Sequence, residues 1–367
     1  MRKMFSRRNV TAACTLTLLV MLAPVAEVNL IATQDKSASS LQKWQAAELQ
    51  TLVDVVGAAL NGDLVQHEDP FTLKSDFLKG MDGLTYVPFT VTLAPESLGE
   101  SSLAMYVYVT PHADDPAVAP EPDGSADDGQ LGLGLPTAVF EDAFFIDVSA
   151  AKAEVWPIVL SRAFTAAGGR YDLYVAIRDS MGEDAGESEA GGAEAGPPVL
   201  MVKSEVEVPD FWNGQLQTSS VILAEVVEPL EQPLTPEEQS ASPYSLGTTR
   251  IVPRQDSDFT RTDELSLIML VYNPTATATQ TPNLTVEYDF HTQSDAGEEF
   301  FNRTSPQEFN DETLPPGFDI GAGHQLVAGQ SIPLAGFPEA AYRLKITVTD
   351  NAAGTSLIRD VNFSVSQ

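Results

Sequence analysis

The 367-residue chain is predicted to be mainly β, with two tandem antiparallel β-sandwiches preceded by one N-terminal helix. Three observations predict this fold. Many stretches after residue 70 alternate apolar with polar residues, as strands that bury one face do. One stretch, 39–62, has apolar residues at helical spacing. The strand RYDLYVAIRDS (170–180) is repeated as AYRLKITVTDN (341–351), which indicates an internal duplication.

Both halves of the chain are expected to place their strands in the same order. We match ELSLIMLVYNP (264–274) with SLAMYVYVTP (102–111), and DVNFSVS (360–366) with EVEVPDF (205–211). The predicted domains are a first sandwich at 70–212, with acidic loops near 111–130 and 180–198, and a second sandwich at 213–367. The second includes a Pro- and Glu-rich connection near 228–243.

The repeated strand begins with Tyr171 in the first copy and Tyr342 in the second. A Tyr at the start of a late strand resembles the tyrosine corner of immunoglobulin-like and fibronectin-like sandwiches, where the hydroxyl bonds to a backbone turn. Alternation is expected to bury the apolar residues that follow, which are Leu173, Val175, Ile177, Leu344, Ile346 and Val348.

The helix is expected to bury the stripe formed by Leu49, Leu52, Val53, Val56 and Leu60. Ser39 and Gln42 are candidates for a capping box, and Asn61-Gly62 is a stop signal. The stripe would pack on the following domain or pair with a copy of itself. A docking helix for a partner is the alternative. Together with a polar spacer, the helix occupies 33–69.

Residues 1–32 are predicted to be an export signal. Arg2, Lys3, Arg7 and Arg8 precede a short apolar run, and small residues follow, with Ala26 or Ala32 as the last residue of the signal. A general secretory signal, a twin-arginine signal and an uncleaved anchor are the alternatives. Cys14, the only cysteine, lies within the run. The mature chain would then lack thiols, which fits the periplasm or exterior of a bacterium.

The formal net charge is −32. Such a charge argues against a nucleic-acid partner and against binding to anionic lipid, because both would be repelled. After signal cleavage, no membrane insertion is expected.

The sequence nominates no catalytic, cofactor-binding or metal-binding residue. The four histidines, His67, His112, His291 and His324, are scattered without ligand spacing, and we interpret His291 as an exposed sheet residue. A calcium site is the alternative where acidic residues cluster, at Asp114, Asp115, Asp123, Asp127, Asp128, Glu183 and Asp184, although none has EF-hand spacing.

Several phrases, among them DFLKGMDGLTYVPFTV, VPDFWNGQLQTSSVIL and PLAGFPEAAYRLKITVTDN, resemble uncharacterised secreted bacterial proteins. They are also similar to β-sandwich regions C-terminal to some von Willebrand factor A-type domains. This resemblance implies a fold and export but no catalytic residues. The metal motif of the A-type domain, Asp-x-Ser-x-Ser, does not occur in the sequence.

The sequence therefore favours a non-catalytic, exported binding or scaffold protein of the bacterial cell envelope. Its β-sandwich surfaces would bind an envelope protein or a glycan, without a cofactor. The alternatives are a calcium-dependent adhesive module and a hydrolase with an unrecognised site.

Overall fold

The computed structural model describes residues 41–63, 69–94, 97–99, 102–114, 135, 138–148, 157–182 and 197–367. These residues form two compact units. The N-terminal unit comprises the described parts of Val25–Ser220 together with Val226–Gln255. The C-terminal unit comprises Val221–Glu225 and Asp256–Gln367. The sequence placed the boundary near residue 212. The compact units divide after Ser220, and 226–255 belongs to the N-terminal unit.

The N-terminal unit has two antiparallel sheets of four strands each. In the first, β3 (Thr85–Leu93) pairs with β1 (Phe71–Ser75), β2 (Leu78–Lys79) and β6 (Ile158–Ala166). The second has the order β5-β4-β7-β8, with β5 at Phe140–Asp147, β4 at Ser102–Pro111, β7 at Gly169–Asp179 and β8 at Leu200–Val208.

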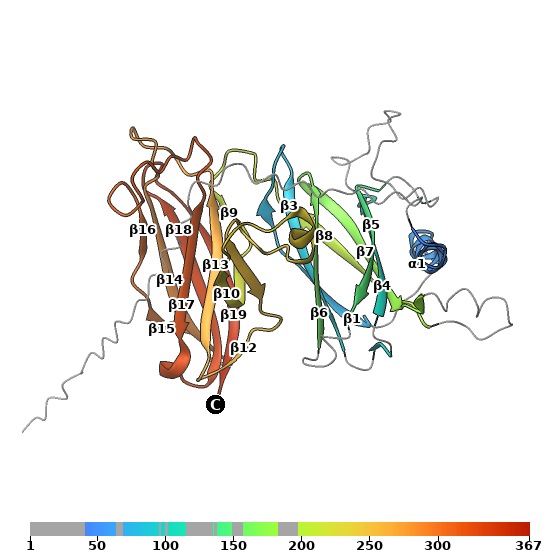
Figure 1. The fold of residues 1–367 in the computed structure, drawn as a ribbon. Coiled ribbons are helices and arrows are strands. Elements are labelled where there is room, and N and C mark those ends of the chain that lie inside the picture. The colour runs from blue at the N-terminus through green and yellow to red at the C-terminus, as the bar shows by residue number, and fades with distance from the viewer. Residues whose placement is uncertain are drawn as a thin grey trace, which may run out of the picture. The chain divides into compact units, whose positions relative to one another are not determined.

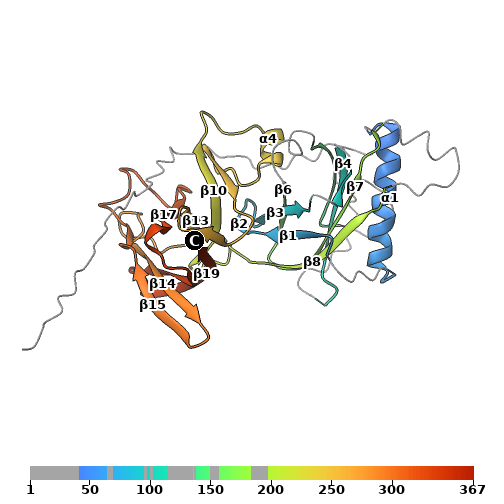
Figure 2. The same ribbon diagram turned by 90° about the horizontal axis from the view of Figure 1, so that it is seen from below.

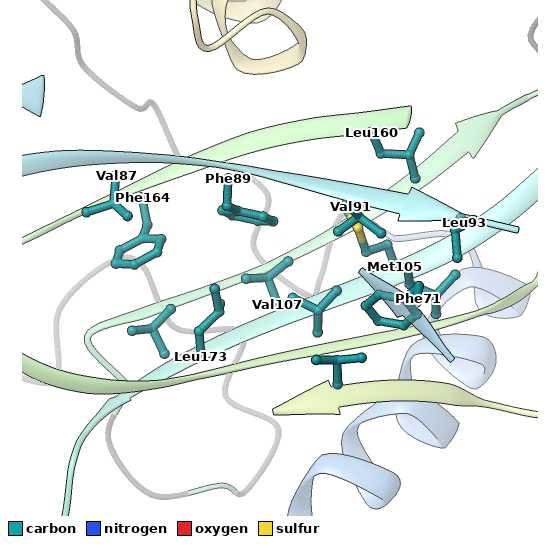
Figure 3. Close-up of a cluster of buried hydrophobic side chains, with 14 of the residues drawn as sticks. Phe71, Val87, Phe89, Val91, Leu93, Met105, Val107, Leu160, Phe164 and Leu173 are labelled. Carbon is teal, nitrogen blue, oxygen red and sulfur yellow. The ribbon is translucent and has the colours of Figure 1, made fainter. Parts of the chain in front are cut away.

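The core of this unit lies between the two sheets. Figure 3 shows Val87, Phe89, Val91 and Leu93 of β3 on one side and Val107 of β4 with Leu173 of β7 on the other. The side chains of Val87, Phe89, Val91 and Leu93 are fully buried. Apolar burial on this scale contributes about 25 cal/mol per Å².

Helix α1 (Lys43–Leu60) forms a third layer of the N-terminal unit. Figure 2 shows it along the outer side of the sheet that contains β4, β7 and β8. Leu49, Leu52, Val53 and Val56 pack there on tyrosine and alanine side chains. The expected packing on the following domain is therefore confirmed.

The start of α1 differs from the expected Ser39–Gln42 capping box, and Ser39 lies outside the described residues. Gln42 is the N-cap, and its backbone N–H donates to Oε1 of Gln45 at 2.9 Å, so a capping box forms three residues later than expected. No helix among the described residues is long and apolar enough to cross a membrane.

Residues 217–255 contain β9 (Gln217–Thr218), β10 (Ile222–Pro229), α4 (Pro236–Ala241) and β11 (Thr249–Pro253). The first residues of β10 belong to the C-terminal unit, and its last residues belong to the N-terminal unit together with its neighbour β11. The predicted Pro- and Glu-rich connection near 228–243 contains the short helix α4, which Thr235 and Glu238 cap.

The C-terminal unit also has two sheets (Figure 1). In one, β13 (Glu264–Tyr272) lies between β10 and β17 (Leu326–Pro333), and the 3-10 helix η5 (Leu334–Gly336) follows. The other has the order β12-β19-β18-β14-β15, with β16 (Gln307–Phe309) also on β14. The bounds are Asp258–Thr260 for β12, Leu284–Ser294 for β14, Gly297–Arg303 for β15, Ala340–Asp350 for β18 and Thr355–Ser366 for β19.

The mainly β fold with antiparallel sheets is thus as predicted, but one strand match is wrong. SLAMYVYVTP is β4, which pairs with the Tyr-led β7. ELSLIMLVY is β13, which lies in the sheet that lacks the Tyr-led β18. The strand that pairs with β18 in the position of β4 is β14, and β13 occupies the position of β3. Both β4 and β13 are nearly continuous apolar runs, so composition alone matched the wrong pair.

Both tyrosines make the hydrogen bond expected of a tyrosine corner. The hydroxyl of Tyr171 donates to the carbonyl of Ala167 at 3.0 Å, and that of Tyr342 donates to the carbonyl of Pro338 at 2.6 Å. Each acceptor lies four residues upstream, so each bond ties the start of a strand to the turn before it.

We expect Tyr342→Phe to lower the free energy of unfolding by about 1 kcal/mol, because one partly buried neutral hydrogen bond is lost while the stacked ring remains on Phe363. Urea denaturation of the two proteins measures this difference. An unchanged midpoint would show that the hydroxyl contributes nothing to stability.

Candidate binding surface

The outer face of the β19-β18-β14-β15 sheet carries a network of ion pairs and hydrogen bonds. Even-numbered residues 284–290 of β14 and 342–348 of β18 are buried, so the odd-numbered residues between them lie on the other side of the sheet. The register places His291 beside Arg343, and Asp289 beside Lys345. We call this surface the outer face. It consists of Glu287, Asp289, His291, Glu298, Phe300, Arg303, Arg343, Lys345, Thr347, Ile358, Asp360 and Asn362.

Arg343 is the centre of the ion pairs on this face. Its Nε donates to Oε2 of Glu298 at 2.7 Å, and its Nη1 pairs with Oδ1 of Asp360. The hydrogen bonds from Arg343 lower the pKa of the Glu298 carboxyl, and the hydrogen bond to Glu298 raises the pKa of Arg343. Because the side chains of Arg343 and Glu298 remain partly exposed, at 23% and 33%, the pairs fix side-chain geometry more than they stabilise the fold.

His291 and Phe300 extend the network towards the sheet edge. Nδ1 of His291 lies 3.1 Å from Oε1 of Glu298, and its ring meets that of Phe300 edge-on at 5.8 Å. A register shift between Phe290 and His291 sets the pairing of His291 with Phe300. His291 is on the outer face, as expected, but its side chain is only 19% exposed.

The charge of the outer face differs from that of the chain. It carries three cationic and four anionic side chains, a net charge of −1 with His291 neutral. The whole chain has 20 Lys and Arg against 52 Asp and Glu. Two large apolar side chains are exposed on the same face, Phe300 at 56% and Ile358 at 48%. The outer face therefore presents charges of both signs in fixed positions together with two exposed apolar side chains.

The corresponding face of the N-terminal unit is covered by α1. There the outward side chains are mainly alanine and tyrosine, and Tyr106, Tyr108 and Tyr174 are buried beneath the helix. The hydroxyl of Tyr106 donates to Oε1 of Glu141 at 2.7 Å, and burial raises the pKa of Tyr106. Burial also raises the pKa of Tyr108 to about 12. Among the described residues, no helix packs in the same way on the outer face of the C-terminal unit.

The other histidines lie apart from this face. Nδ1 of His112 is 2.9 Å from Oδ1 of Asp172, whose other oxygen pairs with Nζ of Lys203 at 3.0 Å. His324 accepts a hydrogen bond from the backbone N–H of Asp319 at Nδ1. His67 lies outside the described residues.

The calcium prediction falls largely outside the described residues, which include Asp114 but not the other six carboxylates. Within the described part of the chain, no group of three potential metal ligands lies together. A groove of about 260 Å³ between β1 and β8 is lined by Asp69 as its only carboxylate among described residues. Among the described residues, this groove therefore does not contain the pair of carboxylates that a glycoside hydrolase would use.

A buried polar cluster that the sequence did not indicate joins Asp76 to the segment 226–255. Tyr244, three residues after α4, donates its hydroxyl proton to Oδ2 of Asp76 at 2.9 Å. The hydroxyl of Thr90 lies 3.5 Å from that of Tyr244. Asp76 is 4% exposed, and this burial raises the pKa of its carboxyl. The cluster anchors 226–255 within the N-terminal unit.

No protein-family model and no curated protein sequence matches the chain. The chain is distantly similar to solved structures of bacterial alpha-2-macroglobulins. Trypsin-activated alpha-2-macroglobulin from Escherichia coli is 11% identical, with a TM-score of 0.21 over 82% of this chain and 17% of that chain. A Salmonella alpha-2-macroglobulin mutant is 10% identical, with a TM-score of 0.18 over the same shares. The chain thus spans about 17% of the length of these proteins.

Proposed function

We propose that the protein is an exported, non-catalytic binding protein of the bacterial cell envelope, and that its outer face binds a protein with a net positive surface. The observation that carries this proposal is the charge-balanced, ion-paired face with exposed Phe300 and Ile358. Arg343, held between Glu298 and Asp360, gives that face a fixed pattern of charge that a partner could match.

The charge of the chain supports a basic partner. A net charge of −32 attracts a cationic protein over long range and repels a second copy of the same chain. On the outer face itself the charges nearly cancel. The electrostatic cost of bringing a partner of either charge close to this face is therefore small. The exposed side chains of Phe300 and Ile358 would then supply the apolar area that contributes most of the affinity.

The repeated strand order of the two units is consistent with this proposal. The two units share the strand order in which the Tyr-led strand pairs with a hairpin strand and with the closing strand. We infer that one copy kept its outer sheet face free for a partner, while the other copy covered its own with α1.

We expect Ile358→Glu to weaken binding of the partner about tenfold or more, because it replaces an exposed apolar contact with a hydrated carboxylate that would have to be desolvated on binding. The mature protein, tagged at its C-terminus, would be cross-linked in native envelope extract and compared with the variant. Val159→Glu is the matched control, since Val159 is 41% exposed in the N-terminal unit.

A stoichiometric basic protein that is captured by the native chain and by Val159→Glu but lost with Ile358→Glu would support the proposal. Recovery of the chain alone, or capture that Ile358→Glu leaves unchanged, would contradict it. Repeating the capture in the presence of a calcium chelator distinguishes this proposal from a calcium-dependent adhesive module, because only the adhesive module requires calcium for binding.

A further inference from the structure

The exposed indole of Trp212 is held in one orientation by its surroundings. Trp212 lies between β8 and β9 and is 46% exposed. Its Nε1 donates to the carbonyl of Leu84 at 3.0 Å, and its backbone N–H donates to Oδ1 of Asp210 at 2.8 Å. The ammonium of Lys79 lies 4.2 Å from the ring centroid. An indole fixed at its edge and on one side keeps substantial ring surface towards solvent.

The loop that carries Trp212 is also tied together by hydrogen bonds. Oδ1 of Asn213 accepts from the backbone N–H of Gln215 at 2.9 Å and from Nε2 of Gln217 at 3.0 Å. Nε2 of Gln217 also donates to the carbonyl of Asp210 at 2.7 Å. Gly214 has a φ of 75°, which a residue with a side chain adopts only with strain. Little conformational entropy would therefore be lost if this loop bound a ligand.

From this arrangement we propose that Trp212 is the stacking platform of a site for a neutral oligosaccharide, with Lys79, Asp210 and Asn213 as the polar groups around it. The C–H bonds on one face of a pyranose ring carry partial positive charge and are attracted to the negative face of an indole. The hydroxyl groups at the ring's rim hydrogen-bond to amide, carboxylate and ammonium groups.

The charge and shape of the site define the ligand class. Lys79 and Asp210 bring one charge of each sign, and the chain carries −32, so an anionic polysaccharide would be repelled. Trp212 lines neither the groove between β1 and β8 nor the groove at Arg261 and Ala335. A flat platform suits a chain of linked sugar rings that lies across it, and not a single enclosed sugar. This site shares no residue with the outer face, and all its residues belong to the N-terminal unit.

Titration of the full mature protein with two neutral hexasaccharides, one of β-1,4-linked glucose and one of β-1,4-linked N-acetylglucosamine, tests the proposal by calorimetry. We expect at least one of them to bind, and Trp212→Ala to raise its Kd about tenfold or more. Trp212→Phe should retain part of the affinity, because an aromatic face remains. Phe300→Ala is the matched control, since it removes the exposed aromatic ring of the C-terminal unit.

The absence of binding by both hexasaccharides would overturn the proposal, as would binding that Trp212→Ala leaves unchanged. If Trp212→Ala instead abolishes capture of the basic protein, the indole is a protein contact and the sugar site is rejected. Thermal unfolding of each variant, with an unchanged midpoint, confirms that a loss of binding comes from the site. Ile358→Glu should leave sugar binding intact, so a failure of the sugar-binding proposal can be told apart from a failure of the protein-binding proposal.

Discussion

Val56→Asp is expected to detach α1 from the N-terminal unit and to lower the free energy of unfolding by roughly 3 to 5 kcal/mol. Val56 is fully buried in the cluster that α1 forms with Tyr106, Tyr108 and Tyr174. A carboxylate there would have no cationic partner within that apolar cluster. The helix would have to leave the sheet, or the carboxyl would have to stay protonated, and each is costly.

The release of α1 would expose the tyrosines beneath it. Hydrogen exchange should become fast across 43–60 while the sheet cores stay protected, and urea unfolding should start at a lower concentration. Ala46→Asp is the matched control, because Ala46 is exposed near the start of the same helix, where an acidic residue is favourable. Unchanged exchange in Val56→Asp would show that the burial of Val56 does not hold α1 on the sheet.

This result would distinguish a structural helix from a docking helix. A helix whose release costs several kcal/mol is part of the domain, and its apolar stripe is not available to a partner. The sequence left both roles open, because an amphipathic stripe does not reveal what it packs against. The buried Glu48 adds to the case for a structural role: its Oε2 accepts from the hydroxyl of Ser180 at 2.8 Å, and its Oε1 accepts from the N–H of Met181.

The strands were predictable because alternation is local. The inward positions of β7 and β18 are those that the sequence indicated, with Leu173, Val175, Leu344 and Ile346 fully buried. The sequence also indicates that a helix covers the outer side of the sheet that contains β4 and β7, although the prediction of the fold did not use that observation. The outward residues of β4 include Ala104, Tyr106 and Tyr108, which are apolar or aromatic, so the strand is buried on both faces.

The sites could not be predicted because their residues are distant in sequence. Arg343 and Glu298 are 45 residues apart, and Tyr244 and Asp76 are 168 apart. The pairing of His291 with Phe300 follows a register shift in a hairpin, which periodicity does not specify. Trp212 reads in sequence as an ordinary loop aromatic. The hydrogen bond to the carbonyl of Leu84, 128 residues away, and the ammonium of Lys79 near the ring show that the indole is fixed.

Tyr244→Phe is the second large effect that we expect, a loss of about 2 kcal/mol at neutral pH. The substitution removes a hydrogen bond to a buried carboxylate, which is worth more than a bond to a neutral group. Asp76 would keep its hydrogen bond with Ser220 but lose the one that joins it to 226–255. Tyr288→Phe is the matched control, because the buried Tyr288 donates to the neutral Oε1 of Gln307. An equal loss in both variants, measured by urea denaturation, would contradict a charged partner for Tyr244.

The same cluster predicts a pH dependence whose sign follows from burial. The folded pKa of Asp76 is raised above its ordinary value of 3.8, mainly by desolvation, while Lys74 and the hydrogen bonds from Tyr244 and Ser220 partly oppose the rise. The contribution of Asp76 to stability is therefore fullest below pH 3.8 and declines as the pH rises through the folded pKa. Asp76→Asn can still accept the proton of Tyr244 but cannot ionise. Relative to the native chain, it should gain stability as the pH rises from 3.5 to 8.

The difference between the two proteins isolates Asp76, because the other carboxylates titrate equally in both. Tyr244→Phe should extend the decline to higher pH, since the lost hydroxyl no longer lowers the pKa of Asp76. Urea denaturation of all three proteins across this pH range measures both effects. A difference that grows as the pH falls would mean that the folded pKa of Asp76 is depressed, and that the carboxylate stabilises the anchor of 226–255 through its charge.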